Sequence, residues 1–183
     1  MKSIYDDTLT PQEEHWHFWR QELDWANSTF NEYLYDKKEA KRFDTQNKKI
    51  LADMYWQESQ WCYNWYNKRI QLAEKQAQLS GLVKSLDYKK VIKKPNYISH
   101  KLPESAYKNK LTESEQHLHI AHIQRHWASD AMRDANYNKN QAKLFKSKGK
   151  LILAQMYQTE YEWCIFWYNR RIRIVEKHEK QVK

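Results

Sequence analysis

Histidine and glutamate residues recur at matching positions in the two halves of the chain, in an arrangement that could hold a metal ion. The candidate ligands are His15, His17 and Glu74 in the first half and His117, His119 and Glu176 in the second. Helical bundles bind di-metal centres with such side chains on facing helices. However, the Glu-x-x-His spacing typical of those centres occurs only at Glu14 to His17, since the counterpart of Glu14 is Gln116. We therefore expect no metal or other cofactor, and a carboxylate/histidine di-metal bundle is the second alternative.

A second set of charged residues lies within apolar sequence and predicts a buried polar network. Glu58 and Glu160 are each preceded by Met and Tyr and followed by Trp and Cys at helical spacing, so these side chains would surround the carboxylate on a helix. A carboxylate in such surroundings needs a partner. The arginines eleven residues further on lie about 16 Å away along the helix, and across an antiparallel arm they would meet Glu22 and Gln124. The predicted network comprises Glu22, Glu58, Arg69, Glu160 and Arg171.

No catalytic constellation accompanies these carboxylates. The sequence has no Cys-His or Ser-His-Asp arrangement with a recognisable local signature and, with only two glycines, no glycine-rich phosphate loop. Glu58 and Glu160 could act as acid and base, but a network that fixes the register of packed helices explains them without catalysis. We therefore expect the protein not to be an enzyme.

Positive charge is concentrated in four segments of a chain whose net charge is +9. Two of them are polar turns, one joins the two halves and one is the C-terminal stretch at 168–183, and the first three contain the candidate binding residues. The candidate binding residues are Lys37, Lys38, Lys41, Arg42, Lys48 and Lys49 at the first turn, Lys139, Lys143, Lys146, Lys148 and Lys150 at the second, and Lys89, Lys90, Lys93 and Lys94 between the halves. Such clusters bind phosphate backbones through counterion release, without reading a base sequence. We expect the chain to bind nucleic acid or a nucleoprotein, although a solvated surface would explain the lysines equally well.

The elements that must position these residues come in two copies. Displacing the sequence by 102 positions aligns residues 9–78 with 111–180 without a gap and gives 28 identities in 70 positions. The stretch QWCYNWYNKRI at 60–70 returns as EWCIFWYNRRI at 162–172. Two copies of this length indicate a doubled supersecondary unit and not a solenoid array.

Each copy is predicted to be a helical hairpin. Thr10 with Glu13, and Thr112 with Glu115, have the spacing of capping boxes, which predicts helix starts near residues 11 and 113. Apolar residues then recur at helical steps until polar stretches at 42–48 and 144–150, and a second apolar stripe follows each stretch. One hairpin has too little apolar surface to be stable alone, so we expect the two to pack together.

The predicted fold is all-α: a four-helix bundle made of two duplicated hairpins, related by a pseudo-twofold axis and joined by a long basic linker. The hairpins are placed at 1–78 and 111–183 and the linker at 79–110, within one compact domain. The two turns could lie at the same end of the bundle or at opposite ends. In the expected register Trp25 faces Trp65, and Trp127 faces Trp167.

The overall composition favours a folded helical protein. Nine Trp and thirteen Tyr exceed what disordered segments carry, and few Gly and Pro favour long helices over strand hairpins. No run approaches the roughly 18 apolar residues of a membrane span, and the N-terminus does not resemble a signal peptide. We therefore expect a soluble, intracellular (cytoplasmic) protein. The alternative function is a protein-binding adaptor or inhibitor, of the kind that viruses and mobile elements encode, whose aromatic and basic face docks on a partner.

Overall fold

The computed structural model of the chain describes residues 1–83, 102–108 and 110–182. It contains the α-helices α1 (Pro11–Thr45), α2 (Lys49–Ser80), α3 (Glu113–Ser147) and α4 (Leu151–Glu179), and a short 3-10 helix, η2 (Glu104–Tyr107). No β-strand occurs in these residues. The prediction of an all-α fold is therefore confirmed.

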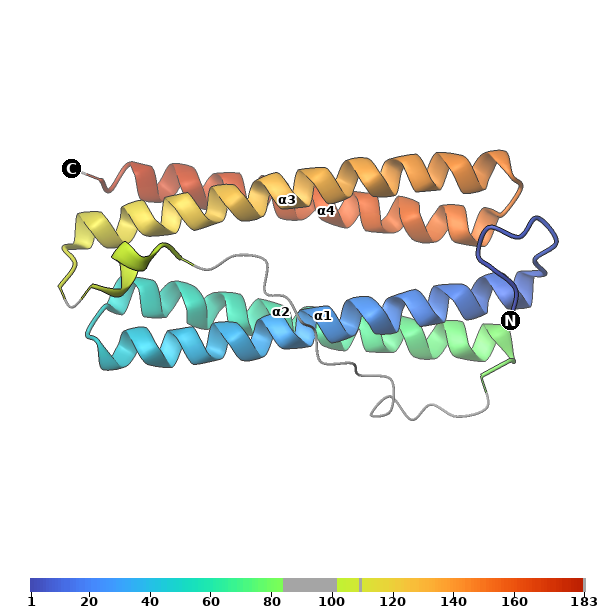
Figure 1. The fold of residues 1–183 in the computed structure, drawn as a ribbon, viewed down its shortest axis with the longest axis horizontal. Helices are drawn as coiled ribbons and strands as arrows, with labels where there is room; N and C mark the ends of the chain where they lie inside the picture. The colour runs from blue at the N-terminus through green and yellow to red at the C-terminus, as the bar shows by residue number, and fades with distance from the viewer. Residues whose placement is uncertain (84–101, 109, 183) are drawn as a thin grey trace.

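The helices form two antiparallel hairpins. α1 packs along α2 and α3 packs along α4, and the two hairpins lie beside one another (Figure 1). The turn between α1 and α2 lies at one end of the bundle and the turn between α3 and α4 at the other (Figure 1). Since the basic clusters flank the turns, they are separated by nearly the length of a 35-residue helix, about 52 Å.

The helices begin and end where the local sequence signals place them. Thr10 and Glu13 form a reciprocal capping box at the start of α1, and an equivalent pair starts α3, as predicted. Asn47 and Gly149 occupy the left-handed region at the two turns, with φ of 55° and 72°. Asparagine and glycine adopt this conformation at lower cost than other residues. The polar stretches therefore mark the turns correctly.

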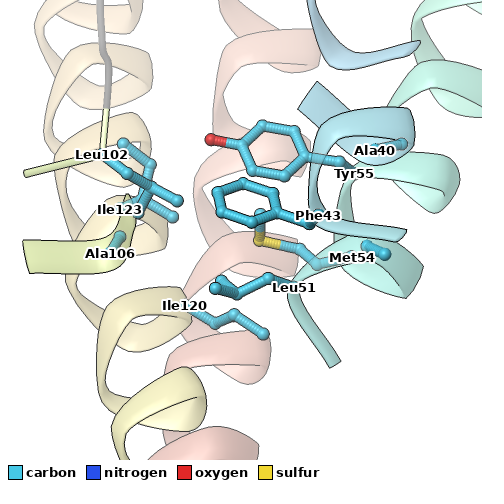
Figure 2. Packing of buried hydrophobic residues seen from close by; sticks show 10 residues of the cluster. Ala40, Phe43, Leu51, Met54, Tyr55, Leu102, Ala106, Ile120 and Ile123 are labelled. Atoms are coloured by element: carbon cyan, nitrogen blue, oxygen red, sulfur yellow. The ribbon is translucent and has the colours of Figure 1, made fainter. Parts of the chain in front are cut away.

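The main apolar cores lie toward the two ends of the bundle. At the first turn Phe43, Leu51 and Tyr55 are completely buried, and Ile120 and Ile123 of α3 pack into the same cluster (Figure 2). The cluster at the second turn consists of Phe18, Ala142, Phe145, Leu153, Ala154, Met156 and Tyr157. Each of these cores joins the turn of one hairpin to the first helix of the other.

No helix among the described residues has the length and apolar character needed to cross a membrane.

A covering segment before each hairpin lies over the turn of the other hairpin. These covering segments are residues 1–9 and 102–108. Tyr107 of the second segment stacks on Phe43 with ring centroids 5.4 Å apart, and Tyr5 of the first stacks on Phe145 at 5.8 Å. Tyr5 and Tyr107 are themselves 102 positions apart. The offset that relates the hairpins therefore also relates their covering segments.

The lysines that end the two turns are buried beneath the covering segments. Lys48 is 2% exposed and donates to the carbonyl oxygen of Ala106 at 2.9 Å. Lys150 is 3% exposed and donates to the carbonyl oxygen of Ile4 at 3.2 Å. The sequence analysis placed both lysines on a phosphate-binding surface. Their ammonium groups instead fix the covering segments to the turns and are not available to an external phosphate.

The N-termini of α2 and α4 are capped by side chains from the opposite hairpin. Glu14 of α1 accepts hydrogen bonds from the backbone N–H groups of Ile152 and Leu153 at 3.1 and 3.2 Å. Gln116 of α3 accepts one from the backbone N–H of Leu51 at 3.4 Å. A carboxylate is also favoured at this end of a helix by the helix dipole. Glu14, the acidic residue of the Glu-x-x-His spacing, therefore caps α4.

Candidate functional site

A buried arginine from the first hairpin links three helices at the centre of the bundle. Arg69 of α2 donates to Glu22 of α1 at 3.1 Å and to Glu160 of α4 at 2.7 Å, and all three side chains are buried. We call these residues the first network. Glu160 belongs to the other hairpin, so the interaction fixes how the two hairpins lie against each other. Removing one partner from a buried ion pair leaves an uncompensated charge and is strongly destabilising.

An arginine at the equivalent position of the second hairpin forms the second network. Arg171 of α4 donates to Gln124 of α3 at 2.8 Å and to Glu58 of α2 at 3.1 Å. Gln124 and Arg170 both donate to the other oxygen of Glu58, at 3.2 and 3.1 Å. Burial would raise the pKa of Glu58, but Arg171 and Arg170 outweigh this effect and lower it. The structure brings the five predicted network residues into these two networks, places Gln124 beside Arg171 as expected, and adds Arg170.

The two networks differ at one position, where Glu22 in the first corresponds to Gln124 in the second. Gln124 uses its amide N–H to satisfy a carboxylate oxygen, and Glu22 has no such group when ionised. Within the described part of the chain, Oε2 of Glu160 is buried without a hydrogen-bond partner. Burial raises the pKa of Glu22 to about 7, although Arg69 opposes the rise, and the nearby charge of Glu160 contributes to it. Two carboxylates therefore share a single guanidinium in the first network.

Tryptophan rings surround both arginines. The guanidinium of Arg69 lies 4.9, 5.6 and 5.2 Å from the ring centres of Trp25, Trp65 and Trp163, distances at which a cation is attracted to the ring face. Trp25 and Trp65 were expected to face one another, and both lie beside the guanidinium of Arg69. Trp127 and Trp167, the equivalent pair, lie 4.4 and 5.9 Å from the guanidinium of Arg171. The closest recorded ring contact of Trp65 is nevertheless with Trp163 of the other hairpin, at 4.6 Å.

A central cavity of about 580 Å³ adjoins the two networks. Its lining comes from all four helices, largely as equivalent residues of the two copies, such as Asp36 with Asn138 and Cys62 with Cys164. This volume is within the usual range for small-molecule sites. The sequence analysis did not predict a cavity. The feature of the sequence that relates to the cavity is the recurrence of identical aromatic residues in both copies.

Asp36 is the most unfavourably placed carboxylate of the cavity lining. It is 5% exposed, and its one recorded hydrogen bond comes from the thiol of Cys62 at 3.7 Å, a weak donor. Burial raises the pKa of Asp36 well above its ordinary value, and the neighbouring Glu58 and Glu32 add to the rise. At the equivalent position Asn138 donates to the sulfur of Cys164. In the second copy a neutral residue, Asn138, therefore occupies the position equivalent to Asp36.

The predicted binding residues that the structure describes fall into three groups. The six tip lysines, exposed and without an ion pair among the described residues, are Lys38, Lys41, Lys49, Lys139, Lys143 and Lys146. Lys148 pairs with an aspartate of the N-terminal covering segment, and Lys37 and Arg42 contact neighbours on their own helix. Lys48 and Lys150 are buried. Lys89, Lys90, Lys93 and Lys94 lie outside the described residues.

The candidate metal ligands are divided between the two ends of the bundle, because the hairpins run in opposite directions. Nδ1 of His15 lies 2.7 Å from the amide oxygen of Gln76, and Nδ1 of His117 lies 2.8 Å from Nδ1 of His178. Among the residues that the structure describes, no three His, Cys, Asp or Glu side chains are arranged to hold a metal ion. The predicted ligands His17, Glu74, His119 and Glu176 are among the side chains to which this finding applies.

Comparisons with protein-family models, curated proteins and solved structures gave no match to this chain. Its function must therefore be inferred from its own residues.

Proposed function

We propose that the chain is a non-enzymatic module that binds the phosphate backbone of a nucleic acid, free or in a nucleoprotein, through the tip lysines. The observation that carries this proposal is that three exposed lysines lie at each end of the bundle and form no ion pair with any residue that the structure describes. Lys139, Lys143 and Lys146 follow one another at steps of four and three residues, so they share one side of α3. Lysines that no acid neutralises can replace the counterions of several phosphates.

We also propose that the two ends are equivalent sites created by duplication and related by a pseudo-twofold axis. The 28 identities include three lysine pairs near the turns, which are Lys37 with Lys139, Lys41 with Lys143, and the buried Lys48 with Lys150. The matching contacts of the two networks and the two covering segments support this relation. Because the turns lie at opposite ends, the protein would be bivalent, able to hold two nucleic-acid segments about 50 Å apart.

Removing tip lysines is expected to weaken nucleic-acid binding and its dependence on salt. In K143Q/K146Q two phosphate contacts are lost, so the log–log slope of affinity against salt concentration should fall by about two. Glutamine keeps good helix propensity, so the helix should be retained. The measurement is fluorescence anisotropy of labelled 30-nucleotide single strands and 30-base-pair duplexes between about 50 and 300 mM salt, chosen to span the screened range.

The matched control is K68Q/R173Q, which removes two exposed cations of α2 and α4 that do not belong to the tip lysines. It lowers the net charge equally, so a general charge effect would weaken nucleic-acid binding by both variants alike.

Resonance energy transfer between donor- and acceptor-labelled duplexes tests bivalency. The wild type should bring the two duplexes together, and K143Q/K146Q should lose this signal before it loses binding. Equal slopes for the two variants, or no salt-dependent binding of the wild type, would refute the proposal.

A protein partner is the second candidate, because aromatic rings are exposed near mid-bundle. Phe166 is 52% and Trp61 41% exposed, and both contact the ring of Trp167, at 5.5 and 5.7 Å. Exposed aromatic residues are typical anchors of protein interfaces. Binding through this patch would be lost in F166A and would change little with salt, whereas binding through the tip lysines would show the opposite behaviour.

A further inference from the structure

The central cavity contains more acidic than basic groups. Six carboxylates and three guanidinium groups contribute to its lining. The arginines of the two networks, together with Arg133, contact four of these carboxylates. Glu32 and Asp36 are left, and within the described residues neither forms an ion pair. The lining that the structure describes therefore has three more carboxylates than guanidinium groups, and no cation of the described residues forms an ion pair with Glu32 or Asp36.

Glu32 and Asp36 lie one turn apart on α1 and both line the cavity. Asp36 is almost completely buried, whereas Glu32 has a solvent-accessible side chain on the same side of the helix. Burial raises the pKa of Asp36 well above its ordinary value. A carboxylate removed from water without a partner is unfavourable, and a bound cation would remove this penalty.

Much of the remaining lining is aromatic. It includes Trp25, Trp61, Trp65, Trp127 and Trp167. The faces of such rings attract ammonium groups and pack well against the methylene groups beside them. Several of these rings already lie beside the arginines of the networks, so rings in this part of the molecule do accept cations.

We propose that the central cavity is a binding site for a linear aliphatic polyamine. One ammonium group would lie at Glu32 and Asp36, and the methylene chain would run along the tryptophan rings. A second ammonium group would lie at Asp134 on α3, whose present partner, Arg133, is 3.7 Å away and 71% exposed. An excess of three carboxylates matches a triamine better than a monoamine. This site is separate from the tip lysines, and the inference does not depend on nucleic-acid binding.

The test is isothermal titration calorimetry of the nuclease-treated full chain with spermidine. Wild type is expected to show one saturable site, and tryptophan fluorescence should change over the same concentrations. Replacing Asp36 by Asn removes one charge-assisted hydrogen bond, so D36N should lower the affinity roughly 10- to 100-fold. E32Q should also lower the affinity for spermidine. D53N removes an exposed acid of α2 outside the cavity and should leave affinity unchanged.

The second copy supplies a reciprocal variant. Asn138 already occupies the position equivalent to Asp36, so D36N introduces a residue that the fold accepts there, and circular dichroism would verify this. N138D adds a carboxylate to the same cavity and should increase spermidine affinity. If D36N nevertheless fails to fold, the more accessible E32Q decides the question.

Three results would overturn the proposal. One is the absence of saturable spermidine binding to the wild type. The second is an affinity of D36N, or of E32Q where D36N is unfolded, equal to that of D53N. The third is equal binding of butylamine or of an uncharged polyether of spermidine's length, which would exclude a polyamine site. Since K143Q/K146Q should bind spermidine like the wild type, failure of the nucleic-acid proposal and failure of this one can be told apart.

Discussion

Replacing Arg69 by methionine is expected to lower the free energy of unfolding by about 3–5 kcal/mol near neutral pH. Methionine keeps an unbranched apolar side chain that can fill an irregular space, so the main loss is the charge. The substitution leaves the carboxylates of Glu22 and Glu160 buried together without a cation. It also removes a guanidinium from three tryptophan rings. Denaturant unfolding followed by tryptophan fluorescence measures the effect.

Two further arginine variants serve as controls. R125M breaks a pair with Glu179 in which both side chains are substantially exposed, so it should cost no more than about 1 kcal/mol. R171M should fall between the two, because Arg170 and Gln124 still contact Glu58. If R69M is within about 0.5 kcal/mol of R125M, Arg69 does not fix the packing of the hairpins.

Replacing Glu22 by glutamine is expected to stabilise the protein at pH 8 and to have little effect at pH 4.5. The pKa of Glu22 is raised from 4.5 to about 7 in the folded protein. The folded state therefore holds this proton more tightly than the unfolded state, and the stability it contributes is present below pH 4.5 and lost as the pH rises through 7. The loss amounts to about 3 kcal/mol. The glutamine side chain of E22Q avoids this loss and can donate to Oε2 of Glu160, as Gln124 does to Glu58.

The reciprocal variant Q124E should show the opposite change, with a smaller magnitude because Arg170 also neutralises Glu58. Unfolding free energies of wild type and both variants between pH 4.5 and 8 provide the measurement. Burial lowers the pKa of four histidines, which are His17, His119, His122 and His178. Their contribution to the free energy of unfolding is lost as the pH falls, which is opposite in sense to the contribution of Glu22. They contribute equally to each protein, so the difference between E22Q and wild type isolates Glu22. Parallel pH curves would contradict the prediction.

Features set by local sequence were predicted well. Capping boxes and the polar turn stretches define where α1 and α3 begin and where both hairpins reverse, because these signals depend on residues a few positions apart. The pairing of Arg69 with Glu22 also follows from one hairpin, since an antiparallel register is fixed once its turn is located. These predictions need no knowledge of how the hairpins pack together.

Features that depend on the packing of the two hairpins could not be predicted. The sequence left open whether the turns share an end, so the contact of Arg69 with Glu160 and the central cavity were inaccessible. The burial of Lys48 and Lys150 was missed for the same reason, as the segments that cover them precede the aligned repeat. The recurrence of Ser3 as Ser105 and of Tyr5 as Tyr107 is the feature of the sequence that relates these segments.

The exchange of covering segments between the hairpins affects the order in which the chain can complete its structure during synthesis. The first turn stays uncovered until residues 102–108 have emerged from the ribosome, although α1 and α2 were made much earlier. Tyr5 and Glu14 must wait for Phe145 and Leu153, near the end of the chain. Contacts between residues so distant in sequence slow folding compared with two hairpins that fold independently. Tyr5 and Glu14, although made before the four helices are complete, are therefore among the last residues of the bundle to reach their final partners.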